Sequence, residues 1–339
     1  MFGMYRLFLS LLVVLAHLGG AGGFSAGYAV YSFYMLSGWL MTTITNQRYG
    51  FTVRGFTLYC TNRALRIYPL YWVGCVLSIV MIASFGQEAV ASFHKAIVMP
   101  GTFSEIMSNM FIFGLRPDVD GARLVPPTWA IYVELVYYVA IGAVLGRSYR
   151  IAKVWFFISA LYHVVAFVYP MDRYYGILAA SLPFSIGALI YHMQNALRKA
   201  FPFSIKRLLV ASLAYVTFLV VTQVIFTDVR SQTRLPFYAN LLLWSVVIHY
   251  ASQLKIKSKL LLYINKISGD ASYPVYLYHY GVGFIVLEVF DFTPKTITFF
   301  IITVPILLII SISVAMLADG TLERIRKRVS EKAEMQNVM

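Results

Sequence analysis

The sequence predicts an all-α integral membrane protein with about ten transmembrane helices, and its composition and hydropathy support this fold class. Of the 339 residues, 60% are hydrophobic and 12% are charged, and the mean hydropathy is +0.72. Soluble domains carry about 25% charged residues. A transmembrane helix needs about 20 mainly apolar residues, and ten segments of this kind occur: 3–20, 24–43, 66–85, 126–146, 152–169, 175–193, 207–226, 236–254, 272–290 and 296–318. We therefore expect one membrane domain over residues 1–320 and a charged cytoplasmic tail over residues 321–339.

The distribution of basic residues predicts the orientation of these helices. With ten spans, most of the 28 lysine and arginine residues lie on the same side as both termini. Because cytoplasmic loops carry an excess of Lys and Arg, we expect both termini in the cytoplasm. The net charge of +14 then reports membrane topology. We predict a lipid bilayer as the surroundings and no nucleic-acid partner.

The first predicted span contains two ionisable residues, Arg6 and His17. A charged group in hydrocarbon costs about 2.5–3.5 kcal/mol on insertion scales, so such residues are functional candidates by default. Eleven residues at about 100° each complete three turns with roughly 20° left over, so both side chains share one face, roughly 16 Å apart along the axis. This arrangement suits an elongated ligand with an anionic head. The alternative, a histidine that only packs or forms hydrogen bonds, stays open.

The stretch from residue 43 to residue 67 is expected to form an amphipathic interfacial helix that leads into the third span. Arg63 and Arg66 share one face of it, since they are three residues apart. They lie just before Pro69, at the expected start of the span, where free N-terminal amides attract anions. Two guanidinium groups there are suited to binding a phosphate. The alternative is a cluster of charges that only sets the topology.

Glu134 and His279 fall near the middle of two further spans. A buried carboxylate must be paired, hydrated or protonated. Glu134 is therefore either an interhelical hydrogen-bonding group or a partner that orients His17 or a cationic ligand-binding residue. Tyrosines around His279 supply hydrogen bonds within the bundle. His163 in the fifth span is a weaker candidate with no motif around it, and His94, His192 and His249 are expected to be structural. No cluster has the spacing of a metal site, so no metal is predicted.

Two segments have a mainly structural interpretation. Ser37 and Gly38 lie in a small-residue part of the second span, which is typical of close helix packing. The longest loop, over residues 86–125, is expected to face outward. Its apolar piece 106–113 is too short to cross a bilayer, and we expect it to form a re-entrant or interfacial lid.

Five motifs, in this order, resemble the membrane acyltransferase-3 family over nearly the whole chain: Arg6 with His17, FYMLSG at 33–38, RALRIYPLY at 63–71, Trp129 with Glu134, and SYPVYLYH at 272–279. The resemblance implies about ten spans and transfer of an acyl group, usually acetyl, from cytoplasmic acyl-CoA to a hydroxyl of a glycan or glycolipid. Acetyl-CoA is then the expected donor.

The resemblance also implies roles for individual residues. His17 would be the catalytic histidine, and Arg63 and Arg66 would hold the donor. Arg6 and Glu134 match the first-span arginine and the fourth-span carboxylate of the family. Two departures stand out: Ala130 occupies a position where the family often has serine, and no esterase-like domain is appended.

The residues and the resemblance together predict an O-acyltransferase of a bacterial inner membrane, with His17 as general base. Glu134 or His279 would hold its imidazole in the productive tautomer. An acyl-histidine intermediate and the identity of the oxyanion donors are left open. The rival interpretation is a secondary transporter or lipid-linked sugar flippase, and a third is a non-catalytic assembly subunit. The sequence predicts no particular oligomeric state.

Overall fold

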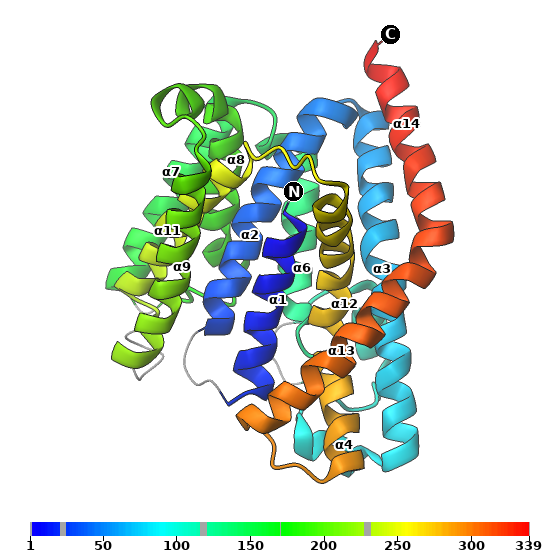
Figure 1. Cartoon of the computed structure of the whole chain (residues 1–339). Helices are drawn as coiled ribbons and strands as arrows, with labels where there is room; N and C mark the ends of the chain where they lie inside the picture. The colour runs from blue at the N-terminus through cyan, green and yellow to red at the C-terminus, as the bar shows by residue number, and fades with distance from the viewer. Residues whose placement is uncertain (1, 21–24, 116–120, 170, 227–231, 339) are drawn as a thin grey trace.

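The computed structural model is a bundle of helices (Figure 1), and it describes residues 2–338 except 21–24, 116–120, 170 and 227–231. The described residues contain no strand. The longer helices are α1 (Gly3–Leu18), α2 (Ser25–Ile44), α3 (Val53–Phe85), α6 (Thr128–Ala140), α7 (Tyr149–Val168), α8 (Ile177–Ala200), α9 (Ile205–Ile225), α11 (Leu235–Ala251), α12 (Lys259–Phe290), α13 (Ile297–Ala318) and α14 (Arg324–Val338). Two short helices and three π-helical turns complete the fold: α4 (Gln87–Phe93), α5 (Phe103–Phe111), η1 (Thr45–Tyr49), η2 (Ile141–Leu145) and η3 (Asp319–Glu323).

The predicted fold class, an all-α membrane protein, is confirmed. A helix lies at each of the ten segments that the hydropathy indicates. Among the described residues, six helical segments are long and apolar enough to cross a membrane: α3, α6 together with η2, α7, α8, α9 and α13. The apolar helices α1 and α11 are shorter. The number of crossings and the cytoplasmic position of both termini stay predictions.

Helix α3 corrects the expectation of a separate interfacial helix before the third span. It begins after Thr52, whose side chain accepts a hydrogen bond from the Gly55 amide, and it continues through Pro69 to Phe85. Arg63 and Arg66 therefore lie in the interior of a long helix. Interior amides already donate to carbonyls one turn earlier, so the free amides of a helix N-terminus are not available beside these two arginines. Any anion bound there must rely on the guanidinium groups.

Helices α1 and α12 run in the same direction and are joined by three regularly spaced hydrogen bonds. The Gly3 amide donates to Asn265 Oδ1 at 3.0 Å, and Ser10 Oγ donates to the Ser272 carbonyl at 2.7 Å. The third bond joins His17 to His279. All three pairs are 262 residues apart in the sequence, and they recur every seventh residue, which is the repeat of a left-handed coiled coil. We call this set the α1–α12 ladder.

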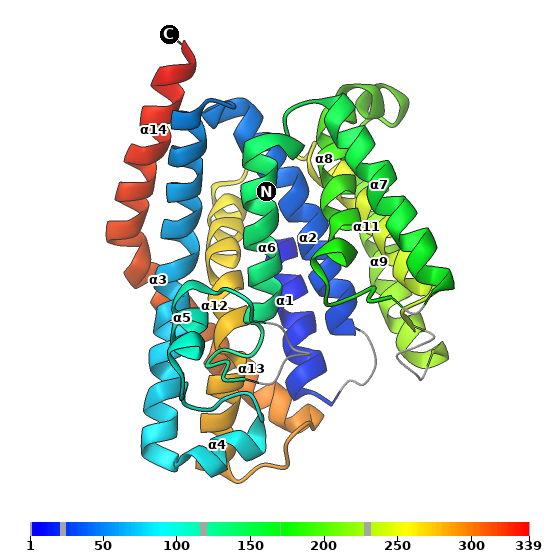
Figure 2. The same cartoon turned by 180° about the vertical axis from the view of Figure 1, so that it is seen from behind.

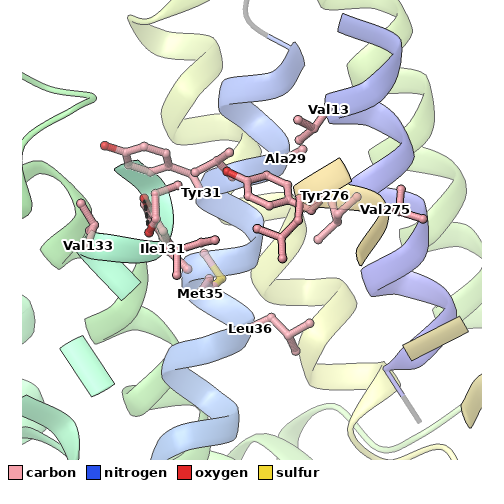
Figure 3. Packing of buried hydrophobic residues seen from close by; sticks show 14 of the residues in the cluster. Val13, Ala29, Tyr31, Met35, Leu36, Ile131, Val133, Val275 and Tyr276 are labelled. Atoms are coloured by element: carbon pink, nitrogen blue, oxygen red, sulfur yellow. Dashed lines mark hydrogen bonds between the residues drawn. The ribbon is translucent and has the colours of Figure 1, made fainter. Parts of the chain in front are cut away.

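The ladder begins at the closest backbone approach between these two helices. A Cβ atom on Gly3 would lie 1.7 Å from the Asn265 carbonyl oxygen, so only glycine fits there. The predicted tight packing around Gly38 is also confirmed, because a Cβ on it would lie 2.3 Å from the Phe184 carbonyl oxygen of α8. Figure 3 shows buried side chains where these helices meet, among them Val13, Leu36, Ile131 and Tyr276.

The loop 86–125 is folded against α3. Glu105 and Thr102 form a capping box at the start of α5. At its other end, side chains of α3 donate hydrogen bonds to carbonyls of α5: Tyr68 to Phe111, Tyr71 to Asn109 and Trp72 to Met110. These bonds satisfy carbonyls that a helix C-terminus leaves without an intrahelical partner. The apolar piece 106–113 thus falls largely within the short helix α5, which is attached to α3. Its role as a re-entrant or interfacial lid stays a prediction.

The charged C-terminal segment forms α14, which lies along the first half of α3 (Figure 2). Asn62 Nδ2 of α3 donates to the Arg326 carbonyl at 3.1 Å and to Ser330 Oγ at 3.2 Å. Tyr49 is hydrogen-bonded to Ser330 as well, at 3.1 Å. The segment predicted as a cytoplasmic tail is therefore packed on the bundle.

Candidate active site

A cavity of about 300 Å³ lies between α1, α2, α3, α6, α12 and α14. Its apolar wall includes Val30, Leu36 and Ile131. Its polar wall is dominated by arginines from four elements, which are Arg6 of α1, Arg63 and Arg66 of α3, Arg326 of α14 and Arg48 of η1. We call Arg6, Arg63, Arg66 and Arg326 the arginine cluster. The structure thus brings together the three arginines that the sequence singled out.

Three members of the arginine cluster, Arg6, Arg63 and Arg66, have no ion-pair partner in the described structure. Arg66 is within electrostatic range of Arg6, Arg63 and Arg326. The Arg63 guanidinium donates to Asn62 Oδ1 at 2.7 Å, while its buried Nε has no partner in the described structure. Arg6, Arg63 and Arg66 therefore present guanidinium groups without counterions to the cavity, and this arrangement suits the binding of a multiply charged anion.

Glu134 is the single carboxylate among the residues that line this cavity. It accepts hydrogen bonds from the hydroxyl groups of Ser37 on α2 and Tyr138 on α6. Ser37 therefore does more than allow close packing. The structure places Glu134 on the cavity side, and no hydrogen bond in the described part of the chain joins it to His17. Its bond to Ser37 is an interhelical hydrogen bond, and its position also exposes it to whatever the cavity binds.

His17 and His279 form a hydrogen-bonded pair with defined donors and acceptors. His279 Nδ1 lies 2.8 Å from the Tyr276 carbonyl oxygen, and His17 Nδ1 lies 2.9 Å from His279 Nε2. A carbonyl can only accept, so His279 carries its proton on Nδ1, and its Nε2 is an acceptor in the neutral ring. His17 must then donate from Nδ1. Its Nε2 consequently keeps a free lone pair, which is the arrangement that a general base needs.

The histidine pair differs in exposure and is covered by aromatic rings. His279 is fully buried at 0% exposure, whereas His17 is half-buried. The Tyr280 ring stacks on His17 with a centroid distance of 5.1 Å, and the edge of His94 contacts Tyr280 at 4.6 Å. Residues of α12 and of the loop after α4 therefore meet beside His17, the less buried imidazole of the pair.

His94, outside the membrane-spanning helices, is held in its neutral form. Burial lowers the pKa of His94 to about 4, and the positive charges of Arg123 and Lys295 act in the same direction. Its Nδ1 accepts a hydrogen bond from the Ala96 amide at 3.3 Å. No sequence pattern predicts this placement, because His94 lies in a loop with no motif around it.

Tyr276 connects the cavity to the histidine pair. Its ring lines the cavity, and its hydroxyl donates to the Pro127 carbonyl at 3.0 Å. Its own carbonyl accepts the hydrogen bond from His279. Tyr276 thus borders the arginine-lined cavity and also holds the histidine pair. The remaining three histidines have structural bonds to backbone carbonyls: His163 to Ala179, His192 to Gly146 and His249 to Phe201.

Sequence reasoning also missed Arg326. A run of charges near the end of a chain is usually solvated, and the segment 324–328 reads as such a run. Only the packing of α14 on α3 shows that one of these side chains points into the cavity. Helical spacing could have identified a candidate, because a helix turns only some residues of a charged run towards its neighbour.

A multi-pass helical bundle with an arginine-lined cavity and a buried histidine pair has the parts of a membrane-bound group-transfer enzyme. Residues 4–317 match the family model described as an acyltransferase domain, that of the acyltransferase-3 family, and the chain belongs to this family. The comparison with curated proteins and the comparison with solved structures gave no match. The protein is therefore a membrane acyltransferase by family, as the resemblance predicted.

Proposed function

We propose that this protein transfers an acyl group, acetyl in the simplest case, from cytoplasmic acyl-CoA to a hydroxyl of an extracytoplasmic or lipid-linked glycan in a bacterial inner membrane. One observation carries the proposal. Tyr276 links the arginine-lined cavity, through its carbonyl and His279, to a histidine whose Nε2 is free. An elongated acyl-CoA donor has two matching parts: an anionic head that the arginines can bind and a reactive thioester at its far end that the histidine can act on.

The donor end of the site is supported by charge. The phosphates of a coenzyme A thioester carry several negative charges, and guanidinium groups bind phosphate through paired hydrogen bonds. Arg6 and His17 stand on one helix, roughly 16 Å apart along its axis. Phosphates at Arg6 and the thioester near His17 would therefore place the connecting arm along α1. The apolar wall of the cavity accommodates that arm.

The chemical step needs a base next to the acceptor hydroxyl. In this proposal His17 Nε2 takes the hydroxyl proton while the hydroxyl oxygen attacks the thioester carbonyl carbon. The tetrahedral oxyanion then collapses, the carbon–sulfur bond breaks, and the departing thiolate takes the proton from the imidazolium. His279 acts as a positioning residue, because its acceptor nitrogen keeps the His17 proton on Nδ1.

A two-step version uses the same nitrogen as a nucleophile. His17 Nε2 would then attack the thioester itself and hold the acyl group until the acceptor arrives. Incubation with labelled acetyl-CoA in the absence of any acceptor distinguishes the versions. Label that stays on His17 after denaturation establishes the two-step route and excludes direct transfer.

Donor binding is the first test, because it requires no knowledge of the acceptor. The melting temperature of the purified protein in detergent is measured with acetyl-CoA, with ATP as an anion control. A ligand at 100 times its Kd stabilises the native state by about 2.7 kcal/mol. We expect this stabilisation in the wild type and in His17→Ala, and its loss in the double variant Arg63→Ala/Arg66→Ala.

The same experiment can overturn the proposal. If saturating acetyl-CoA leaves the melting temperature of well-folded wild-type protein unchanged, the arginine cluster does not hold this donor. The secondary transporter or lipid-linked sugar flippase then becomes the better interpretation of the buried ionisable residues. Equal stabilisation by ATP would show an anion site without specificity for coenzyme A.

A further inference from the structure

Helix α14 contributes a charged side chain to the cavity although it lies outside the part of the chain that matches the family model. The match ends at residue 317, and α14 begins at Arg324. Arg326 nevertheless lines the cavity together with Arg6, Arg63 and Arg66. No motif in the membrane domain assigns it a role.

Several contacts hold α14 where Arg326 reaches the cavity. Asn62 binds the Arg326 carbonyl and the Ser330 side chain, at 3.1 Å and 3.2 Å. One turn further along α14, Glu334 pairs with Arg48 of η1 at 3.3 Å. Both members of that pair are about half-exposed, and exposed pairs contribute only about 0–1 kcal/mol. The attachment of α14 thus combines these polar contacts with burial of Ala333, which is 1% exposed and belongs to the apolar core.

The charge of Arg326 repels those of its neighbours in the cavity while no anion is bound, whereas the Glu334–Arg48 pair acts in favour of docking. Arg326 is among the positive groups whose charge acts on Arg66. Bringing a fourth guanidinium beside three others raises the free energy of the docked arrangement, because like charges in a partly buried site are poorly screened. An anion bound between them reverses the sign of this contribution. Docking of α14 and binding of the anion should therefore strengthen each other.

We propose that α14 completes a phosphate-binding site: Arg326 binds the same phosphate-bearing anion as Arg6, Arg63 and Arg66, and the bound anion tightens the docking of α14 on α3. The identification of the anion as acyl-CoA rests on the proposed function. The inference that the site binds phosphate is independent of the proposed function, because it follows from the guanidinium groups themselves.

The first measurement is binding of inorganic pyrophosphate, and separately of coenzyme A, to the full-length protein in detergent. Arg326→Ala is compared with Arg328→Ala, which removes the same charge from an exposed position of the same helix. We expect about 10-fold weaker binding of both probes in Arg326→Ala, as for loss of one charge-assisted contact. Arg328→Ala should stay within about 2-fold, since exposed charges are screened. Arg326→Lys should recover part of the loss.

The second measurement follows α14 itself. Amide hydrogen exchange over residues 324–334 is recorded with and without pyrophosphate in the wild type and in Arg326→Ala. We expect pyrophosphate to slow exchange there in the wild type only. This readout also detects a variant that has lost the docked helix, because its exchange is already fast without the anion.

The outcomes separate the two proposals. If Arg326→Ala binds pyrophosphate as tightly as the wild type does, or if the wild type binds none, the assignment of Arg326 is wrong. If the wild type binds pyrophosphate through Arg326 and binds no coenzyme A, the phosphate site stands and the acyl-CoA donor is wrong. Slower exchange that persists in Arg326→Ala also overturns the coupling.

Discussion

The arginine cluster and the histidine pair are both polar regions inside an apolar bundle, and they differ in how far the protein satisfies them. Arg6, Arg63 and Arg66 form no ion pair within the described structure. In the histidine pair, three of the four ring nitrogens have a hydrogen-bond partner: His279 Nδ1 donates to the Tyr276 carbonyl, and His17 Nδ1 donates to His279 Nε2. Arginines without counterions are suited to binding an anionic ligand. A histidine pair in which only His17 Nε2 lacks a hydrogen-bond partner among the described residues is suited to chemistry at that nitrogen.

The largest expected effect on the rate of acyl transfer comes from removing the hydrogen bond within the histidine pair. In His279→Leu, His17 Nδ1 loses its acceptor, and the imidazole is free to place its proton on either nitrogen. We expect acyl transfer to slow by about 10²–10³-fold, within the range of general acid–base contributions. The KM for acetyl-CoA should stay unchanged. Initial rates with labelled donor in membranes check both quantities.

His279→Gln is the matched variant for this prediction. Its amide oxygen can accept from His17 Nδ1, so part of the rate should return. The pH–rate profile should also move in His279→Leu, because the free tautomers have a different basicity. A purely structural role predicts loss of folded protein and an unshifted profile in what remains.

A smaller effect, on the affinity for the donor, is expected from a substitution in the arginine cluster. Arg66→Ala removes one charge-assisted contact to the donor, worth about 1.5–3 kcal/mol. The Kd of acetyl-CoA should therefore rise about 10–100-fold, with the rate at saturation nearly unchanged. Titration calorimetry checks this, with exposed Arg150→Ala of α7 as the control. Equal weakening in Arg150→Ala would point to general electrostatic attraction and not to a site.

Glu134, the one carboxylate among the described residues that line the cavity, tests how charge in the arginine cluster affects stability and anion binding. In Glu134→Gln the arginines lose the carboxylate that lines the cavity with them in the described structure, so the protein without anion should melt about 2–5 °C lower. Because that charge also repels a phosphate, the rise in melting temperature on adding pyrophosphate should be larger than in the wild type. Ser37→Ala, which removes a hydrogen bond and no charge, should leave that rise unchanged. A smaller rise in Glu134→Gln would indicate that the carboxylate helps to hold the ligand.

The smallest expected effect concerns His94 and pH. Its pKa is about 4 in the folded protein and about 6.5 in an unfolded chain. The unfolded state binds more protons between these values, so stability falls as the pH drops from about 6.5 towards 4. His94→Gln should flatten this fall by a few degrees in melting temperature, about 2–5 °C. Melting curves between pH 7.5 and pH 4.5 test this, and parallel curves for the two proteins would contradict it.

The sequence predicted the helices well because hydrophobic length is a local property. Each apolar segment of about 20 residues specifies its own helix. The sequence predicted α3 less well, since the charged residues before Pro69 suggested a boundary. Pro69 removes one backbone hydrogen bond and can kink a helix without ending it, and α3 continues through it.

Pairings between distant residues were beyond local reasoning. The sequence offered Glu134 and His279 as alternative partners of His17, and residue types alone favoured neither. The geometry joins His17 to His279 because the α1–α12 ladder fixes the alignment of the two helices. Arg326 and His94 escaped notice for a related reason. Each comes close to the site through tertiary packing of a segment whose own pattern indicates a solvated tail or a loop.

The α1–α12 ladder has a consequence for how such a protein can change. The alignment of the two imidazole rings is set by hydrogen bonds between α1 and α12, whatever the length of chain between them. Insertions in intervening loops that do not contact the pair therefore leave the rings in register, whereas the loop that carries His94 packs on Tyr280 beside His17. One residue inserted inside α1 between Gly3 and His17 would instead turn the imidazole by about 100° away from His279. Diversity in these proteins can accumulate in the connecting loops, while the length of α1 tolerates no change.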